Sequence, residues 1–264
     1  MREPGGLSLQ ARWQAAWRCL FLQGAWNFER LQNIGWAFCV EPALRELYPD
    51  PAARAEALRR HLEFFNTHPY MAGYVLGAAL RAEEEAARLQ GEERVAKASM
   101  VTGLKLGLAG PLAAVGDAFY WATLRPTAAL LGVAWLWLGP HPWHLGAPLV
   151  FLAAYNLPCL WLRLASVHQG YRRGLGVALH VAKLGLPALG EGLRLSALLL
   201  LGGLAGGLTR LTYPGSGRPL SLADNFLFLG AGLFMLLLLR LKMSAVLVWC
   251  LALMTALVLA FAIP

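Results

Sequence analysis

The stretch HLEFFNTHPYM, residues 61–71, places two histidines, a glutamate, an asparagine and a threonine among aromatic side chains. Histidine and glutamate bind metals or move protons, and amides and hydroxyls hydrogen-bond polar ligands. The stretch is not an HExxH motif, because its second histidine follows the first by seven residues, and Pro69 disfavours a helical conformation at His68. The spacing therefore argues against a metal site, and no nucleophile or second acid stands nearby for catalysis.

A break between two helices is the more informative feature of this stretch. The pattern predicts a helix over 52–67 that stops near Asn66, and a new helix that begins at Pro69. In one interpretation, side chains at the break simply cap the unpaired backbone groups of the two helix ends. In the other, Glu63, Asn66 and these backbone groups bind a hydroxylated ligand at membrane depth. Aromatic rings that could stack on a sugar are Phe64, Phe65 and Tyr70.

Two further clusters combine polar residues with helix breakers in a similar way. The first consists of Trp26, Asn27 and Glu29. The second contains Asp117, an isolated acid that follows a predicted Gly-Pro break at 110–111. Asp117 either forms a structural ion pair with Lys105 or Arg125, or accepts hydrogen bonds from a sugar hydroxyl.

The elements that position these residues belong to a strongly apolar chain. Of its 264 residues 58% are hydrophobic and 14% are charged, against about 25% charged in a typical globular protein. Residues 1–100 hold 12 basic and 12 acidic residues, whereas 101–264 hold 11 basic and 3 acidic ones and so carry the whole net charge of +8. The excess positive charges lie beside apolar runs, which fits the loops of a membrane protein, so no nucleic-acid partner is expected.

This pattern predicts an all-α, polytopic integral membrane protein with broken or re-entrant helices. Residues 1–98 are expected to form a helical N-terminal region and 99–264 the transmembrane region. Several apolar runs are shorter than the roughly 20 residues that a perpendicular helix needs, which favours re-entrant or broken helices. The candidate spans are 127–138, 148–162, 195–209, 225–239 and 243–263. Basic residues in 163–194 place that segment in the cytoplasm, and the acidic run 83–85 is expected on a solvated helix face.

The N-terminal region is predicted to start with an amphipathic helix at the membrane interface. Ser8 is its N-cap, and Leu9, Trp13 and Trp17 recur at helical spacing with arginines nearby. The alternative is a surface helix packed on its own domain. A longer helix is expected over 24–50.

Three long motifs, in a fixed order, carry a resemblance to a known family. They are QGAWNFERLQNIGWAFCVEPALRELYPD (23–50), LRRHLEFFNTHPYMAGYVLGAALRAEEE (58–85) and GLKLGLAGPLAAVGDAFYWATLRP (103–126). YNLPCLWLRLASVHQGYRRG (155–174) matches more loosely. The chain resembles the IID component of the mannose/fructose/sorbose family of the sugar phosphotransferase system.

The resemblance implies a multi-pass subunit of the bacterial inner membrane that forms a hetero-oligomer with a IIC subunit. The pair carries a hexose-type sugar across the membrane by an elevator-like movement, in contact with membrane lipid. A cytoplasmic IIB protein, itself phosphorylated by IIA, phosphorylates the sugar. The IID chain is then expected to have no catalytic residue, no metal and no cofactor of its own. The substrate-binding positions that the resemblance carries over are Trp26, Asn27, Glu63, Asn66 and Asp117.

The chain also departs from the family pattern. Gly116-Asp117-Ala118 stands where the family usually reads Gly-Asp-Pro, and the resemblance fades towards the C-terminus. An alternative function is therefore a non-transporting membrane scaffold or sensor that docks the same partners. A third, an intramembrane metalloenzyme, requires a metal held by His61, Glu63 and His68.

Overall fold

The computed structural model describes residues 6–208 and isolated positions between 230 and 254. Within these residues the chain forms helices and two isolated β-bridges, and no strand, so the all-α prediction is confirmed. The chain divides into two units, residues 1–200 and 201–264. The predicted spans 225–239 and 243–263 belong to the second unit and lie outside the continuously described residues.

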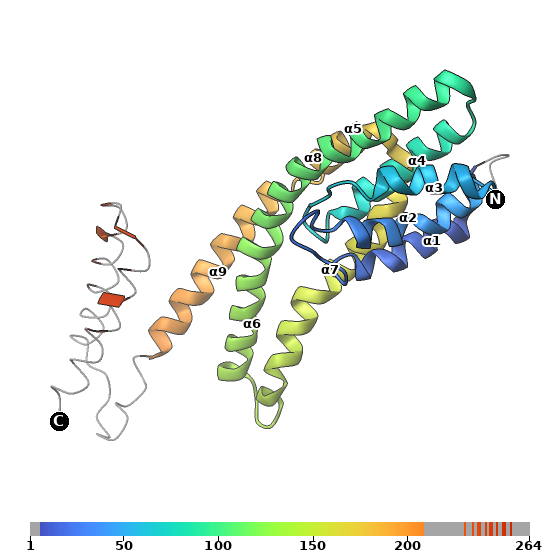
Figure 1. The fold of residues 1–264 in the computed structure, drawn as a ribbon. Helices are drawn as coiled ribbons and strands as arrows, with labels where there is room; N and C mark the ends of the chain where they lie inside the picture. Colours follow the sequence, from blue (N-terminus) through green and yellow to red (C-terminus); the bar gives the residue numbers. More distant parts are fainter. Residues whose placement is uncertain are drawn as a thin grey trace. The chain divides into compact units, whose positions relative to one another are not determined.

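Figure 1 shows the helices of the described chain, most of them joined by short connections. In order they are α1 (Leu9–Arg18), α2 (Asn33–Leu47), α3 (Pro51–His61), α4 (Ala72–Ala87), α5 (Gly91–Gly116), a π-helical segment (Asp117–Leu124), α6 (Arg125–Leu138), α7 (Ala147–Arg173), α8 (Val177–Lys183) and α9 (Leu186–Leu208). Short 3₁₀ turns cover Cys19–Phe21, Trp143–Gly146 and Gly174–Gly176.

Local capping sets the starts of two of these helices. The Ser8 hydroxyl accepts a hydrogen bond from the Ala11 amide at 3.1 Å, which confirms the predicted cap of α1. The Asp50 carboxylate accepts one from the Ala53 amide at 2.8 Å, and Pro51 occupies the first position of α3, where its missing N–H costs nothing.

Two helices are shorter than the sequence predicts, because loop backbone pairs with another loop instead of continuing a helix. The helix expected over 24–50 begins only at Asn33. The helix expected to reach Thr67 ends at His61, and the next begins at Ala72 rather than at Pro69. The predicted break is real, but it is a loop of ten residues, 62–71.

The break predicted at 110–111 is wrong. Helix α5 continues through Pro111 to Gly116, because a proline removes one helical hydrogen bond without having to end the helix. The irregularity lies further on, where the backbone winds as a π-helix from Asp117. Helix α5 also crosses the predicted boundary between 98 and 99 without interruption, and that division of the chain stays a prediction.

Helices α4 and α7 form the closest helix pair of the first unit, and small residues make this approach possible. A Cβ atom built on Gly77 would lie 2.0 Å from the Val167 carbonyl oxygen, and one on Gly170 would lie 2.3 Å from the Tyr74 carbonyl oxygen. Gly73 and Gly77 have GxxxG spacing, which lets two helix backbones touch. The sequence analysis overlooked this motif.

Replacing Gly77 with leucine is expected to destabilise the protein by about 3 kcal/mol or more, because the new side chain collides with α7 backbone that cannot yield. The thermal unfolding midpoint of the detergent-purified full-length chain measures the effect. Gly107→Leu is the matched control, since a Cβ there meets no atom within 4 Å. Equal midpoints for the two variants would contradict the proposed role of Gly77.

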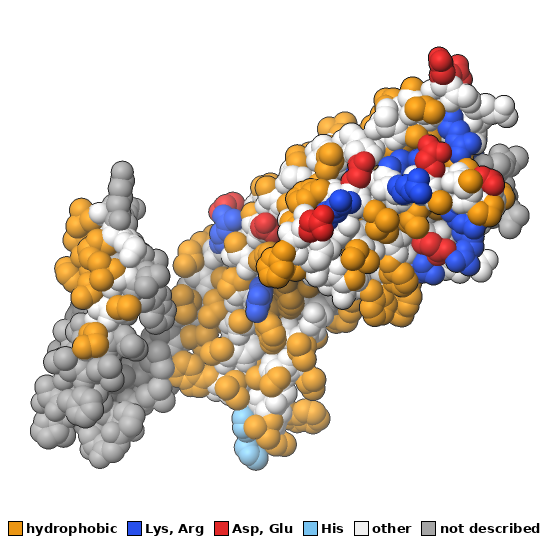
Figure 2. All heavy atoms as spheres, in the orientation of Figure 1, with side chains coloured by type: hydrophobic (Ala, Val, Ile, Leu, Met, Phe, Trp, Pro, Cys, Tyr) orange, Lys and Arg blue, Asp and Glu red, His pale blue; other side chains and the backbone are white. Residues whose placement is uncertain are grey.

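Long apolar helices dominate the second half of the described chain. The helical stretches Gly91–Leu138 and Trp143–Leu204 are long and apolar enough to cross a membrane, by length and composition. They contain the predicted spans 127–138 and 148–162. Helices α6 and α7 pack side by side as an antiparallel arm whose visible face is largely hydrophobic, whereas charged side chains gather over the α1–α5 end (Figures 1 and 2).

Helix α1 turns its large apolar side chains away from the protein. Its buried positions are Ala11, Ala15 and Ala16. Leu9, Trp13 and Trp17, in contrast, are 51%, 55% and 61% exposed. The predicted amphipathic helix is present, and its tryptophans do not pack on the protein's own core. Their insertion into a membrane interface stays a prediction.

Candidate functional site

Two irregular segments, residues 22–32 and 62–71, lie side by side and form one platform, which we call the loop platform. Leu31 and Phe65 form a parallel β-bridge. The backbone amide of Gln32 donates to the Phe65 carbonyl at 2.9 Å, and the backbone amide of Phe65 donates to the Arg30 carbonyl at 3.4 Å. Leu31 has a positive φ of 55°, which turns the chain into this pairing. The two loops thus pair their backbone groups with each other instead of extending α2 and α3 as helix.

Side chains lock the loop platform onto the helices beneath it. The Gln32 amide nitrogen donates to the Thr67 carbonyl at 2.8 Å, and its oxygen accepts from the Thr67 amide at 3.0 Å. The Thr67 hydroxyl donates to the Ala109 carbonyl of α5 at 2.8 Å. Gln32 and Thr67 are both buried. Buried, fully paired groups hold backbone rigidly, so the loop between α3 and α4 has a defined geometry.

Asn27, one of the predicted sugar-binding residues, is engaged in holding its own loop. Its side-chain oxygen accepts from the Arg30 amide at 2.8 Å, and its nitrogen donates to the Asn33 side-chain oxygen at 2.8 Å. The Asn33 nitrogen in turn donates to the Leu62 carbonyl at 2.8 Å. Asn27 therefore links the two halves of the loop platform, and this is a positioning role.

Glu63 and Asn66, two other predicted site residues, lie exposed on the second segment of the loop platform. Within the described part of the chain neither side chain has a hydrogen-bond or ion-pair partner. The backbone around them, in contrast, is held: Asn66 lies between the fixed points Phe65 and Thr67, and Glu63 follows Leu62, whose carbonyl accepts from Asn33. Polar side chains held on a rigid backbone, with unused hydrogen-bonding capacity, are what a polar ligand requires.

Asp117 directly follows the end of α5, which packs against the loop platform. A Cβ atom built on Gly116 would lie 2.4 Å from the His68 side chain, so the end of α5 lies directly against the loop platform. Asp117 is exposed and opens the π-helical segment, and such segments are frequent at functional sites. Among the residues described, Asp117 forms no ion pair. Lys105 is instead buried, with its ammonium 3.3 Å from the Arg60 carbonyl.

Aromatic rings surround this meeting point. His68 stacks on Tyr120 with 5.1 Å between ring centroids, lies 4.7 Å from Trp121 and meets Tyr70 edge-on at 5.2 Å. His68 Nε2 is buried and has no hydrogen-bond partner within the described chain. The sequence pattern around Pro69 indicated aromatic residues here, but Tyr120 and Trp121 reach His68 only through the fold.

The aromatic residues expected to face a sugar differ in accessibility. Trp26 is 44% exposed and packs edge-on against Phe28, and Phe64 is 50% exposed. Phe65 is fully buried with its ring 4.1 Å from that of Trp36. Phe65 therefore cannot stack on a ligand, which corrects that part of the sequence-based expectation. Phe65 is buried while Phe64 is exposed because the backbone is extended at the β-bridge, where adjacent side chains point to opposite sides.

His61, the first histidine of the opening stretch, is a structural residue with both ring nitrogens occupied. The Trp36 indole donates to Nδ1 at 2.9 Å. Indole is only a donor, so the proton of the neutral ring is on Nε2, which lies 2.9 Å from Glu83 Oε1. Burial lowers the pKa of His61, against the pull of the Glu83 charge, and the ring stays neutral near pH 7. Over the described ranges no group of three His, Cys, Asp or Glu residues could hold a metal.

Glu83, expected on a solvated face, is the centre of a buried network, and that expectation is wrong. Its carboxylate accepts two hydrogen bonds of 2.7 Å from Arg60 and one of 2.8 Å from Tyr48. Burial by itself raises the pKa of Glu83, but the hydrogen bonds from Arg60 and His61 outweigh it and lower the pKa to about 2. The neighbouring Glu84 is also buried, where it accepts from Tyr171 and pairs with Arg88.

A sequence signal for this network existed. Leu76, Leu80 and Ala79 are buried on α4, and continuing that face by three or four residues reaches Glu83. The three adjacent acids obscured this periodicity. The network ties α2, α3 and α4 together directly behind the loop platform.

Long apolar helices, with a rigid polar platform packed against Ala109 and Gly116 of α5, define a helical membrane protein. Its fold is similar to that of a chain called "Structure of membrane protein", with a TM-score of 0.72, 31% identity and 96% of each chain covered. A chain of the cryo-EM structure of the mannose transporter ManYZ in complex with microcin E492 is also similar, with a TM-score of 0.58 and 32% identity over 97% of this chain and 96% of that one.

The family follows from the sequence comparisons. The pattern of the family described as "PTS system mannose/fructose/sorbose family IID component" matches residues 6–263. The mannose-specific EIID component of Escherichia coli K12 is 40% identical over 198 residues, which are 75% of this chain and 67% of that relative. The chain belongs to the IID components of the mannose/fructose/sorbose family of the phosphotransferase system, and the predicted resemblance is confirmed.

Proposed function

We propose that this IID component forms, with a IIC subunit, the sugar path of a mannose-type translocator in the bacterial inner membrane. A IIB protein, itself phosphorylated by IIA, would phosphorylate the hexose on the cytoplasmic side. One observation carries the proposal: within the described chain Glu63 and Asn66 are exposed and their side chains have no hydrogen-bond or ion-pair partner, on a loop whose backbone is locked by Gln32 and Thr67. The relatives reported above are transporter components, so the scaffold alternative gains no support from them.

The chemistry of the site is recognition rather than catalysis. The Asn66 amide both donates and accepts hydrogen bonds, and the carboxylates of Glu63 and Asp117 accept them from sugar hydroxyls. Trp26 offers an exposed ring on the other segment of the loop platform, and an aromatic face suits the apolar side of a sugar ring. Asn27 contributes by holding its loop in place. In this proposal the phosphoryl group comes entirely from the IIB partner.

The proposed orientation follows from the distribution of charge. Basic residues of 163–194 favour the cytoplasmic side for that segment. Because 163–194 lies inside Trp143–Leu204, the parts of that stretch on either side of it would cross the membrane, as would part of Gly91–Leu138. Reaction of a cysteine introduced at exposed Lys183 with a membrane-impermeant reagent, in cells and in inverted vesicles, tests the assignment.

Reconstitution of uptake tests the function. Cells that lack their own mannose-type system and express IIA, IIB and IIC are expected to accumulate phosphorylated hexose only when this chain is added. Mannose, fructose and sorbose are measured separately, since the family includes all three sugars. Tight co-purification with IIC without uptake or phosphorylation of any of them would favour the scaffold alternative and contradict the proposal.

A further inference from the structure

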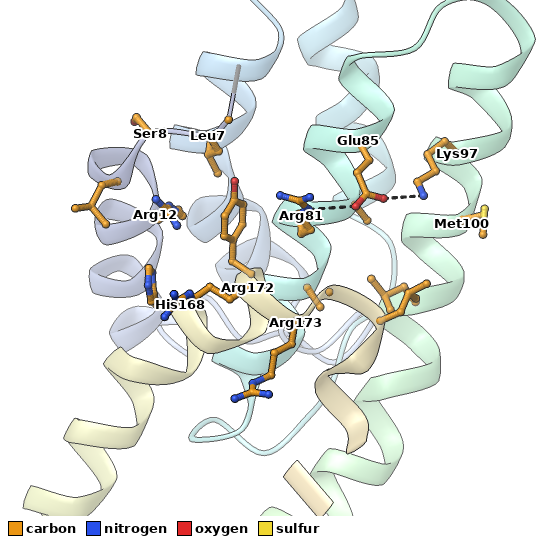
Figure 3. Close-up of a pocket in the computed structure, with 18 of the residues that line it drawn as sticks. Leu7, Ser8, Arg12, Arg81, Glu85, Lys97, Met100, His168, Arg172 and Arg173 are labelled. Carbon is orange, nitrogen blue, oxygen red and sulfur yellow. Dashed lines mark hydrogen bonds and ion pairs between the residues drawn. The ribbon is translucent and has the colours of Figure 1, made fainter. Parts of the chain in front are cut away.

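The first unit also has a concave site, lined by no residue of the loop platform. It is a cavity of about 1170 Å³ between helices α1, α4, α5 and α7 (Figure 3). Its lining is rich in basic side chains. They are Arg12, Arg81, Lys97, His168, Arg172 and Arg173. The proposed sugar site uses none of them, so the cavity needs its own explanation.

The positive charge of this cavity is only partly compensated. Glu85 pairs with Arg81 at 3.2 Å and with Lys97 at 2.7 Å, as the dashed lines in Figure 3 show. On the opposite wall, Arg172 and Arg173 have no ion pair within the described residues and are exposed. A concave surface with surplus positive charge concentrates anions.

Arg12 adds a second observation on the same wall. Its Nε atom is buried and has no hydrogen-bond partner within the described chain, while its guanidinium lies 4.5 Å from the Tyr171 ring centroid. Figure 3 shows Arg12, His168 and Arg172 grouped at one side of the cavity. A buried donor without a partner costs free energy that an anionic ligand would recover.

Part of the remaining lining is apolar and exposed, which argues against a fully soluble anion. Leu9, Met100 and Leu175 line the cavity and are 51%, 57% and 72% exposed. Leu9 also belongs to the outward apolar face of α1 that continues through Trp13 and Trp17. Basic groups beside an exposed apolar and tryptophan-rich surface match a ligand with an anionic head and hydrocarbon chains.

We propose that this cavity binds the headgroup of an anionic phospholipid, whose acyl chains lie along the outward face of α1. The phosphate accepts hydrogen bonds from Arg12 and Arg172, which lie on one side of the cavity in Figure 3, and Arg173 adds positive charge to the lining. The bound lipid would fasten α1 and α7 to one membrane leaflet beside the transport unit. Assignment to the cytoplasmic leaflet rests on the orientation given under the proposed function, whereas the binding itself does not depend on sugar transport.

Lipid titration of the full-length chain in a neutral detergent tests the proposal. Dihexanoyl phosphatidylglycerol is expected to raise the unfolding midpoint saturably, and dihexanoyl phosphatidylcholine, sn-glycerol 3-phosphate and inorganic phosphate are not. Arg172→Gln/Arg173→Gln should weaken the phosphatidylglycerol response at least about tenfold, because one charge-assisted contact and a second lining charge are lost. The charge-matched control Arg59→Gln/Lys183→Gln changes exposed residues that do not line the cavity and should leave the response unchanged.

A second variant keeps every charge and tests the cavity by filling it. Gly103 lines the cavity and a Cβ there meets no atom within 4 Å, so Gly103→Trp should fold and block the lipid. Gly107→Trp, one turn further along α5 and outside the lining, should also fold but should leave lipid binding unchanged. Equal responses to the two lipids, equal responses of Gly103→Trp and Gly107→Trp, or inorganic phosphate matching phosphatidylglycerol would overturn the proposal. Loss of IIB binding in the arginine variant, with lipid affinity unchanged, would assign the cavity to a protein partner instead.

Discussion

Replacing Asn66 with alanine is expected to lower kcat/KM for hexose uptake by at least about tenfold, since an amide that both donates to and accepts from sugar hydroxyls contributes about 1–3 kcal/mol. The loss should appear without a loss of folded protein. Asn66 is exposed, and its backbone is fixed by the Gln32–Thr67 and Thr67–Ala109 hydrogen bonds, which the substitution leaves intact. The measurement is radiolabelled uptake in the reconstituted system, with membrane levels of the chain determined in parallel.

Two comparison variants make this result specific. Gln90→Ala removes an exposed amide at the start of α5, far along the chain from the loop platform, and should transport normally. Asn27→Ala should lower uptake together with thermal stability, because its side chain orients Asn33, which donates to Leu62 of the other loop segment. An unchanged kcat/KM in Asn66→Ala would remove Asn66 from the sugar site while leaving the family assignment untouched.

Replacing Glu83 with glutamine is expected to cost about 3–5 kcal/mol of folding free energy, because it leaves Arg60 as an uncompensated charge in a largely buried place. The glutamine also loses one of the oxygens that accept from Arg60, His61 and Tyr48. Glu85→Gln is the matched control on the same helix. Its partners Arg81 and Lys97 are partly exposed, so its loss should cost no more than about 1 kcal/mol.

The same carboxylate predicts a dependence of stability on pH. The pKa of Glu83 falls from its ordinary value of 4.5 to about 2 in the folded protein. Its contribution of about 3 kcal/mol is therefore complete above pH 4.5 and is lost as the pH falls from 4.5 towards 2. Thermal unfolding between pH 6 and pH 2.5 is expected to show a smaller acid loss in Glu83→Gln than in the wild type. Parallel curves for the two proteins would contradict the assigned network.

Local signals predicted the parts of the fold that depend on neighbouring residues. The Ser8 cap, the outward tryptophans of α1 and the break after α3 all follow from short-range pattern, and each is present. The sequence alone was enough to choose the polar residues of loop 62–71 as a candidate site, because amides and carboxylates stand out in an apolar chain and are usually functional at membrane depth. Whether they bind sugar is still a prediction.

Long-range contacts decided what the sequence analysis missed. The extent of loop 62–71 depends on its pairing with loop 22–32, and no local rule reports a partner 35 residues away, as Gln32 is from Thr67. The burial of Glu83 required Arg60 and Tyr48 to arrive from α3 and α2. Pro111 stayed within a helix because surrounding structure, rather than local propensity, sets where a helix ends.

The sequence by itself determined that this is an all-helical membrane protein of the IID family, because hydrophobic runs, charge asymmetry and long motifs are properties of the chain alone. The tertiary structure decided which polar residues are available and which are occupied. It separates exposed Glu63 and Asn66 from the engaged Asn27, His61 and Glu83. Availability depends on where distant hydrogen-bond partners lie, and only the folded chain brings those partners together.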